Sequence, residues 1–332
     1  MYNEIKHKGA INVVGIKDIA KKAGVSISTV SYALNNSSKV TEKTRAKIMA
    51  IANDLNYIPN MAARTLKTRE TKIIGVYLTS YGGVFYSELL DGLTNSLYKH
   101  GYELIACSGK KSHRFLPEKM IDGAIILDAT FPTEEILNYA DRGHKLVVLD
   151  REITHENIGQ VLLDNRAGST LAIDYLSTNF SGDFYIVTGP DDSYDAMIRL
   201  QTAKDELARF GDKEVHIIEG DFSEASGELA AKKIEKEWEK PVSVFALNDN
   251  MAIGMYRHFQ QTNLKIGEDI RIVGFDNTPI SEYLNPRLST IEYSKYKWGA
   301  LAAEQLVKLL EGKEATNEII YTTLITSPSV SK

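Results

Sequence analysis

The sequence predicts a protein in two parts, a small helical head at the N-terminus and an α/β body made of two doubly wound, parallel-sheet lobes. Apolar residues between Gly15 and Tyr57 recur at helical spacing in three short stretches. From Lys72 onward, short apolar runs alternate with amphipathic stretches, which is typical of parallel strands joined by helices. These runs predict more strands than one compact open sheet usually contains, and we therefore expect two lobes. The runs are residues 73–78, 102–107, 123–127, 146–149, 160–163, 184–187, 215–218, 242–247 and 270–275.

The composition is that of a compact folded protein. Of the 332 residues, 43% are hydrophobic and 25% are charged, which excludes a disordered or collagen-like chain. No run approaches the roughly 18 apolar residues of a membrane span, and residues 1–10 lack a signal-peptide apolar stretch, so we expect a cytoplasmic protein. The single cysteine, Cys107, excludes an internal disulfide and a multi-cysteine metal site, and we expect it to be a buried strand residue.

Charge is distributed unevenly along the chain. Residues 1–70 contain 12 Lys/Arg and 5 Asp/Glu, a balance of +7, whereas the whole chain has 39 and 44, so the remainder carries −12. A basic head on an acidic body is typical of a polyanion-binding module fused to a sensor or enzyme domain.

The first predicted helix of the head has a clear beginning and end. Ile16, Ile19, Ala20 and Ala23 lie on one helical face, and Gly24 follows as a stop signal.

Two further helices follow in the head. Ser26 is a suitable N-cap for a second helix that runs to about Asn35, with Val30 and Leu34 on its inner side. Thr41 can cap a third helix. Two short helices joined by a tight turn and braced by a third make a helix-turn-helix unit.

In the body, polar residues gather where the predicted strands end. Ligands of doubly wound folds bind at the carboxyl ends of the strands, so these positions form the candidate site. The connection at residues 108–121 is too short for a full crossover helix. The strand-end candidates are residues 79–81, Asp128, Asp150, Gly189, and residues 220–222, 248–249 and 276–277.

An enzymatic function finds no support in the motifs. Tyr81-Gly82-Gly83 is not a dinucleotide-binding glycine pattern, no phosphate-binding Walker loop occurs, and the histidines are scattered. We therefore expect no catalysis, no cofactor and no metal. A secreted binding protein would need an export signal and would have no use for the head.

The motifs of the head resemble a known family. They are IKDIA at 16–20, AGVS at 23–26, STVS at 28–31, LN at 34–35, TEKTR at 41–45 and LNYIPN at 55–60. This pattern is similar to the DNA-binding head of the lactose-repressor/galactose-repressor family, and the likeness extends over the rest of the chain.

The resemblance implies which side chains contact operator DNA. In the family a recognition helix enters the major groove, so Ile27, Ser28 and Tyr32 would face bases. The family commonly has arginine, a reader of guanine, where this chain has Tyr32, which predicts an altered base preference. The other expected head contacts, chiefly to phosphates, are Ser26, Thr29, Ser31, Asn35, Thr41, Thr44 and Tyr57.

The resemblance also implies a hinge helix after Pro59. In the family this segment pairs with its dimer mate in the minor groove and wedges a leucine, here Leu66, between base pairs. The expected hinge contacts are Asn60, Ala63, Arg64, Leu66 and Lys67.

The body resembles the family's periplasmic-binding-protein-like sensor, in which two lobes close on a small molecule. The likeness is clearest at ALND (246–249), AIG (252–254) and IVGFDN (272–277). Arg forks and carboxylates each engage adjacent hydroxyls, which favours a sugar. The expected effector-binding residues are Tyr81, Phe85, Tyr86, Asp150, Arg199, Phe222, Asn248 and Asp276.

Together these inferences predict a homodimeric repressor of a carbohydrate-utilisation operon, released from its operator by a sugar or a sugar-derived effector. Two alternatives remain open, a phosphocarrier-protein corepressor as in catabolite-control members and a purine-type corepressor. The expected organisation is a flexible arm (1–13), a head (14–59), a hinge helix and linker (60–71) and a body (72–332). Within the body we expect an N-lobe at about 72–163 and 293–322, and a C-lobe at about 164–292 and 323–332.

Overall fold

The computed structural model describes residues 14–59, 65, 68–82, 85–180, 182–211 and 214–331. These residues form two compact units, Met1–Glu70 and Thr71–Lys332. The expected arm at 1–13 and most of the expected hinge, including Leu66, lie outside the described residues. In the part of the chain that is described, no helix is long and apolar enough to cross a membrane.

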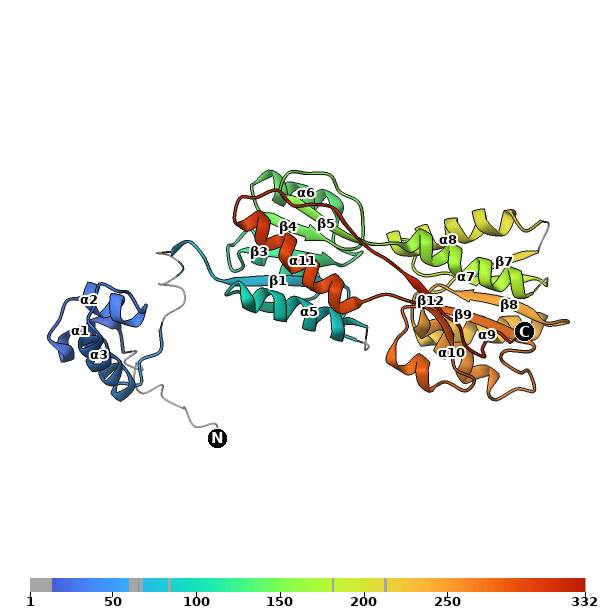
Figure 1. Cartoon of the computed structure of the whole chain (residues 1–332), viewed down its shortest axis with the longest axis horizontal. Coiled ribbons are helices and arrows are strands. Elements are labelled where there is room, and N and C mark those ends of the chain that lie inside the picture. Colours follow the sequence, from blue (N-terminus) through green and yellow to red (C-terminus); the bar gives the residue numbers. More distant parts are fainter. Residues whose placement is uncertain are drawn as a thin grey trace, which may run out of the picture. The chain divides into compact units, whose positions relative to one another are not determined.

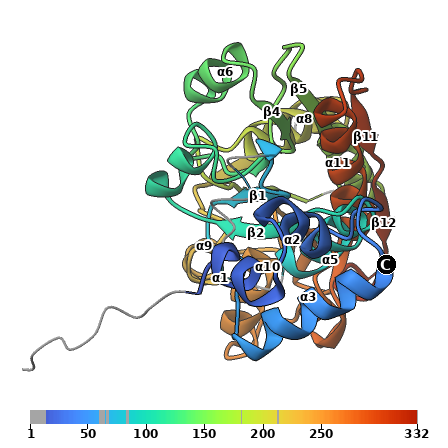
Figure 2. The same ribbon diagram turned by 90° about the vertical axis from the view of Figure 1, so that its left-hand side faces the viewer.

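The head contains the three predicted helices, α1 (Ile16–Ala23), α2 (Ile27–Leu34) and α3 (Glu42–Asp54) (Figures 1 and 2). Gly24 ends α1 in the left-handed conformation, with a φ of 69°, which glycine adopts without steric cost. Ser26 caps α2 and Thr41 caps α3, each accepting a backbone N–H three residues later. The helix assignments in the head are therefore confirmed. The fully buried Ile19, Val30 and Ile48, one from each helix, form its core.

The first sheet of the body has six strands in the order β11-β5-β4-β3-β1-β2, and all neighbouring strands pair in parallel. We call it, with its helices, the N-lobe. Its strands are β1 (Ile73–Leu78), β2 (Glu103–Cys107), β3 (Gly123–Leu127), β4 (Lys145–Val148), β5 (Ile158–Leu163) and β11 (Glu318–Ile320).

The second sheet, which forms the C-lobe, has the order β12-β10-β9-β8-β6-β7. All its pairs are parallel except β10 with β12. The apolar runs did not predict β10, β11 and β12, which have only three or four residues each. The strands are β6 (Phe184–Val187), β7 (Val215–Ile218), β8 (Val242–Ala246), β9 (Ile270–Phe275), β10 (Ser289–Glu292) and β12 (Thr323–Ile325).

Helices cover both faces of each sheet (Figure 1). In the N-lobe α5 packs against α11, and α6 packs near β4. In the C-lobe α7 packs with α8, and α9 with α10. The bounds are α5 (Tyr86–Lys99), α6 (Thr133–Asp141), α7 (Asn165–Asn179), α8 (Tyr194–Ala208), α9 (Glu224–Glu237), α10 (Asp249–Phe259) and α11 (Lys295–Leu310).

The chain crosses between the lobes three times, after β5, after β10 and after β11 (Figure 1). Three crossings that lie close together allow the lobes to rotate about them while each sheet stays intact. This connectivity also means that each lobe is assembled from segments that are distant in the sequence.

The short connection after β2 contains no crossover α-helix, as predicted, but a single 3₁₀ helix, η1 (Lys110–Phe115). Cys107, the last residue of β2, is buried, which confirms that prediction. A second 3₁₀ helix, η2 (Pro279–Tyr283), follows β9.

Paired glycines allow close contact between helices on each lobe. A Cβ atom on Gly92 of α5 would overlap the backbone oxygen of Tyr296, and one on Gly299 of α11 would overlap that of Leu89. Gly227 and Gly254 make the same reciprocal contact between α9 and α10. Backbone atoms cannot move aside as a flexible side chain can, so these glycines are required by packing rather than by backbone conformation.

We predict that Gly299→Ala destabilises the body by about 1–3 kcal/mol, because overpacking against the backbone of α5 outweighs the gain of up to about 1 kcal/mol in helix propensity. Urea unfolding measures the difference. Glu304→Ala, an exposed position of the same helix, is the control and should change stability by no more than about 0.5 kcal/mol. Wild-type stability in Gly299→Ala would contradict this account of the helix contact.

Candidate functional site

The N-terminal end of α2 offers a free surface on the head. Ile27 is 46% exposed although it is a large apolar residue, and Ser28 is exposed beside it. The inner side of the same helix is occupied by Val30 and Ala33, which are buried. A short helix whose first turn is exposed and whose opposite face is fixed in a core has the geometry of a recognition helix.

Several hydroxyls predicted to contact phosphate also stabilise the head itself. Thr29 N–H donates to Ser26 Oγ at 3.0 Å, and the two hydroxyls lie 2.8 Å apart. Thr41 and Thr44 repeat the arrangement at the start of α3, with hydroxyls 2.9 Å apart. Helix N-termini bind anions through exposed N–H groups and the helix dipole, so capping and phosphate contact are compatible there.

The remaining head residues differ in burial. Asn35 is exposed and donates from its side chain to Ser31 O at 2.7 Å. Tyr32 and Tyr57 are half-buried against the head core, and Lys39 Nζ lies 5.1 Å from the centre of the Tyr32 ring. The predicted hinge contacts lie outside the described residues; they are Asn60, Ala63, Arg64, Leu66 and Lys67.

A cavity of about 700 Å³ lies between the two lobes of the body. It collects the carboxyl ends of strands from both sheets, as expected for doubly wound folds. Tyr81, in contrast, does not line it, because this side chain is 67% exposed and its hydroxyl donates to Ala106 O at 3.3 Å. The predicted effector residues that do line the cavity are Phe85, Tyr86, Asp150, Arg199, Phe222, Asn248 and Asp276.

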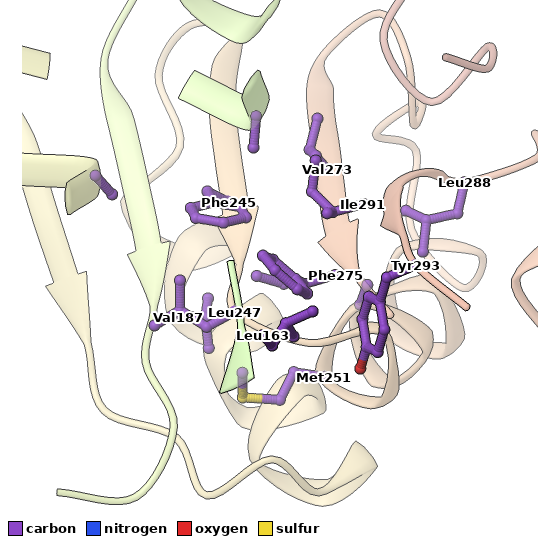
Figure 3. Packing of buried hydrophobic residues seen from close by; sticks show 14 of the residues in the cluster. Leu163, Val187, Phe245, Leu247, Met251, Val273, Phe275, Leu288, Ile291 and Tyr293 are labelled. Carbon is purple, nitrogen blue, oxygen red and sulfur yellow. The ribbon is translucent and has the colours of Figure 1, made fainter. Parts of the chain in front are cut away.

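Arg199 of α8 lies at the base of the cavity and is only 4% exposed. Its Nε donates to Asn165 Oδ1 and its Nη1 to Leu247 O, both at 2.7 Å. The guanidinium stacks 3.6 Å above the ring centre of Phe275, which fills the C-lobe core beside Leu247 and Tyr293 (Figure 3). A flat cation fixed on an aromatic face and by two hydrogen bonds is preorganised for a ligand.

Asp276, at the end of β9, shares this base. Its Oδ1 lies 3.9 Å from Arg199 Nη1 and accepts from Tyr293 OH at 2.8 Å, while buried Lys295 donates to its backbone oxygen. Burial raises the pKa of the Asp276 carboxyl, and the charges of Arg199 and Lys295 oppose that shift. The backbone φ of Asp276 is 113°, which is unfavourable for a residue with a side chain. Strained backbone of this kind occurs mainly at functional sites, where the surrounding structure holds it in place.

Asp150 and Asn248 also line the cavity. Arg151 holds Asp150 in a two-point ion pair, Nε to Oδ1 at 3.0 Å and Nη2 to Oδ2 at 2.8 Å. Asn248 caps α10 through Met251 N–H, and its amide donates to Phe222 O at 3.0 Å. Asn248 therefore positions the Phe222 segment, whose φ of 68° is also strained, as well as facing the cavity.

Sequence reasoning missed an acidic segment after β6. Asp191, Asp192 and Asp195 line the cavity, and Asn165 donates to Asp195 Oδ1 at 2.6 Å. Burial raises the pKa of Asp195 to about 6, opposed by Arg199 and reinforced by Asp150. Three carboxylates within eight residues of the end of β6 were a signal that could have been used.

The two lobes also contact each other at the cavity. Tyr194, the first residue of α8 in the C-lobe, donates to Glu152 Oε1 at 3.1 Å, and Glu152 follows β4 of the N-lobe. Both residues line the cavity, so this bond depends on how far the lobes are closed.

One cluster of side chains in the C-lobe has the composition of a metal site, but we do not propose that it binds a metal. Ligand atoms of Asp183, Glu214 and His216 lie within 4.8 Å of one another at the β6–β7 edge. Lys240 Nζ, however, lies 3.0 Å from Asp183 Oδ2 and already balances its charge.

Comparisons with known proteins match both the head and the body. The model for bacterial regulatory proteins of the lacI family matches residues 15–60, and that for the periplasmic binding protein-like domain matches residues 183–330. The HTH-type transcriptional repressor PurR of Vibrio parahaemolyticus is 33% identical over 310 residues, covering 90% of this chain and 92% of that protein.

Solved structures extend the similarity. A sugar-binding transcriptional regulator of the LacI family from Enterococcus faecalis is 52% identical, with a TM-score of 0.76, over 80% of this chain and 99% of that one. The lac repressor dimer bound to operator and the anti-inducer ONPF is 26% identical, with a TM-score of 0.84, over 96% and 99%.

The fold and the sites define a DNA-binding transcriptional regulator controlled by a small-molecule effector, and not an enzyme. The chain belongs to the LacI family of bacterial regulatory proteins.

We predict that Asp195→Asn stabilises the protein at pH 7.5 and that the gain shrinks below pH 6. The folded-state pKa of about 6 lies above the ordinary value of 3.8, so the ionised carboxylate costs stability at neutral pH. As the pH falls through 6, the folded wild type takes up a proton before the unfolded chain does and recovers that loss. Urea unfolding midpoints at pH 7.5 and 5 measure it.

Asp192→Asn, at an exposed neighbouring position, serves as the control and should show a smaller, pH-independent change. A destabilised Asp195→Asn variant at pH 7.5, or a gain of equal size at both pH values, would show that this carboxylate is not strained.

Proposed function

We propose that this protein is a homodimeric repressor of carbohydrate-utilisation genes and that its effector is an uncharged sugar. The observation that carries the proposal is the cavity lining, in which carboxylates and guanidinium groups converge from both lobes. Such groups bind pairs of adjacent hydroxyls with defined geometry. The 52% identical Enterococcus faecalis protein is described as sugar-binding, which supports this choice.

The charge of the lining supports an uncharged effector over a phosphorylated one. Seven carboxylates and two guanidinium groups line the cavity, and Arg151 is already paired with Asp150. A phosphate group would be repelled at close range in a partly enclosed, low-dielectric site. Phe85, Tyr86 and Phe222 add apolar faces against which a sugar ring can stack.

A purine-type corepressor is the second candidate. The 33% identical Vibrio relatives named PurR favour it, and the same aromatic side chains could stack on a planar base. Corepression by a phosphocarrier protein has less support, because the described residues already provide a cavity of small-molecule size that is lined by both charged and apolar side chains.

In the proposed mechanism, two heads bind a pseudo-palindromic operator and the effector selects one arrangement of the lobes. Arg199, Asn248 and Asp276 belong to the C-lobe and Asp150 to the N-lobe, so a ligand that contacts all of them favours closure. Release of DNA requires that the closed form oppose pairing of the hinge segments, since a ligand shifts an equilibrium only by its differential affinity. The head and hinge would contact DNA through the residues predicted from the family pattern.

We predict that an unphosphorylated sugar, in a panel that also contains sugar phosphates and purine bases, weakens operator binding in gel retardation. Arg199→Lys should reduce the response to that sugar at least about tenfold while operator affinity without sugar is unchanged, because a planar two-point donor is lost. Glu239→Gln, at an exposed C-lobe position, is the control. If only a purine or a phosphocarrier protein alters DNA affinity, the sugar proposal is wrong.

Base preference offers a test of the recognition helix. Tyr32 has no guanidinium with which to read guanine, so Tyr32→Arg should create a guanine preference of about 1–3 kcal/mol at one operator position. Selection from a randomised operator library measures this preference. Tyr32→Phe keeps the ring packing and should retain the wild-type profile; identical guanine preference in wild type and Tyr32→Arg would rule out base contact at this position.

A further inference from the structure

A second pocket, of about 600 Å³, lies in the N-lobe where the short connection leaves β2. A 3₁₀ helix takes the place of a crossover α-helix there, and the reduced bulk leaves a hollow beside the strand end. Hydrogen bonds from Tyr81 OH to Ala106 O and from Ser108 Oγ to Thr79 O fix its wall. None of its lining residues belongs to the effector cavity.

The lining of this pocket is basic, opposite in sign to that of the effector cavity. Lys110, Lys111 and Arg114 line it together with a single carboxylate, Glu135. Arg114 is paired with Glu118 at 3.0 Å. Lys110 and Lys111 are exposed, and neither forms an ion pair with any residue that the structure describes.

His113 provides a second, independent indication of a ligand. It is only 3% exposed, its ring stacks on Phe131 at a centroid distance of 3.6 Å, and its Nδ1 lies 3.3 Å from Glu135 Oε2. Its other nitrogen, Nε2, is buried without a hydrogen-bond partner among the described residues. Burying such a group unsatisfied is costly, so its presence in a pocket wall favours a partner that is supplied from outside.

Glu135 does not cancel the basic character of the pocket. Its Oε1 accepts from Tyr139 OH at 2.5 Å while its Oε2 faces His113, so both oxygens are engaged within the wall. The carboxylate thus orients the imidazole, in the way that a carboxylate commonly fixes a ligand-binding histidine.

We propose that this pocket is a second ligand site that binds a phosphate group, either free or carried by a small metabolite. Lys110 and Lys111 supply the charge, and the His113 imidazole supplies a positioned ring nitrogen that has no partner among the described residues. Phosphate, with its several acceptor oxygens and double charge, matches a cluster of donors on one short segment. The site is separate from the sugar cavity, so it stands or falls independently of the proposed effector.

The test is calorimetric titration of the full-length protein with inorganic phosphate, glucose 6-phosphate and glucose at low ionic strength. We expect Lys110→Gln/Lys111→Gln to weaken phosphate binding at least about tenfold, the equivalent of losing one charge-assisted hydrogen bond. His113→Gln should weaken it as well. If His113→Gln proves unstable, the lysine pair, at exposed positions, still decides the question.

The basic head also attracts phosphate, so a charge-matched control is required. Lys233→Gln/Lys236→Gln removes two exposed charges from α9, which lines neither pocket, and should leave phosphate affinity unchanged. Stronger binding of glucose 6-phosphate than of inorganic phosphate, lost in the Lys110/Lys111 variant, would identify a phosphorylated metabolite as the ligand, and equal binding a free phosphate. Equal loss in both lysine pairs, or wild-type affinity in the Lys110/Lys111 variant, would overturn the proposal.

Discussion

The effector cavity depends on one buried interaction, the stacking of the Arg199 guanidinium on the ring of Phe275. The same guanidinium reaches the start of α7 through Asn165 and the end of β8 through Leu247, and faces Asp276 at the end of β9. Three strand-end or helix-start segments are thereby held in one arrangement. Burying a cation costs free energy unless the cation is hydrogen-bonded and paired with an anion. The loss of any one of these contacts would therefore weaken the others.

The cost of burying charge also explains why the cavity is suited to a ligand. Asp276 and Asp195 both have raised pKa values because burial penalises their ionised forms. Hydroxyl groups of a ligand can donate to these carboxylates and compensate for the water that was removed. Side chains held in a binding site at a cost to stability are common in proteins.

Electrostatic separation runs through the whole chain. The first 70 residues carry +7 and the remainder −12, which allows one part to lie against DNA phosphates while the other does not compete for them. Within the body the division is repeated on a smaller scale, with an acidic cavity between the lobes and a basic pocket on the N-lobe. Net charge alone would have hidden both divisions.

The sequence alone determined the structural features that depend on residues close together in the chain. Gly24, Ser26 and Thr41 end or cap helices through bonds within a few residues, and for that reason they could be identified from spacing. Alternating strands and helices likewise placed Asp150 and Asp276 at the carboxyl ends of their strands, where ligands of doubly wound folds bind.

Only the tertiary structure decided the rest. The sequence pattern did not show that Tyr81 turns to the second pocket, that Arg151 holds Asp150, or that Asn248 caps a helix while it supports Phe222. Arg151 and Asp150 are neighbours in the chain, but their pairing depends on the loop conformation after β4. The contacts of Tyr81 with Ala106 and of Asn248 with Phe222 join distant segments, and residue spacing carries no information about how loops and helices bring such segments together. Charge type and position along a strand are local properties of the chain, whereas the partner that each charge finds is a property of the folded protein.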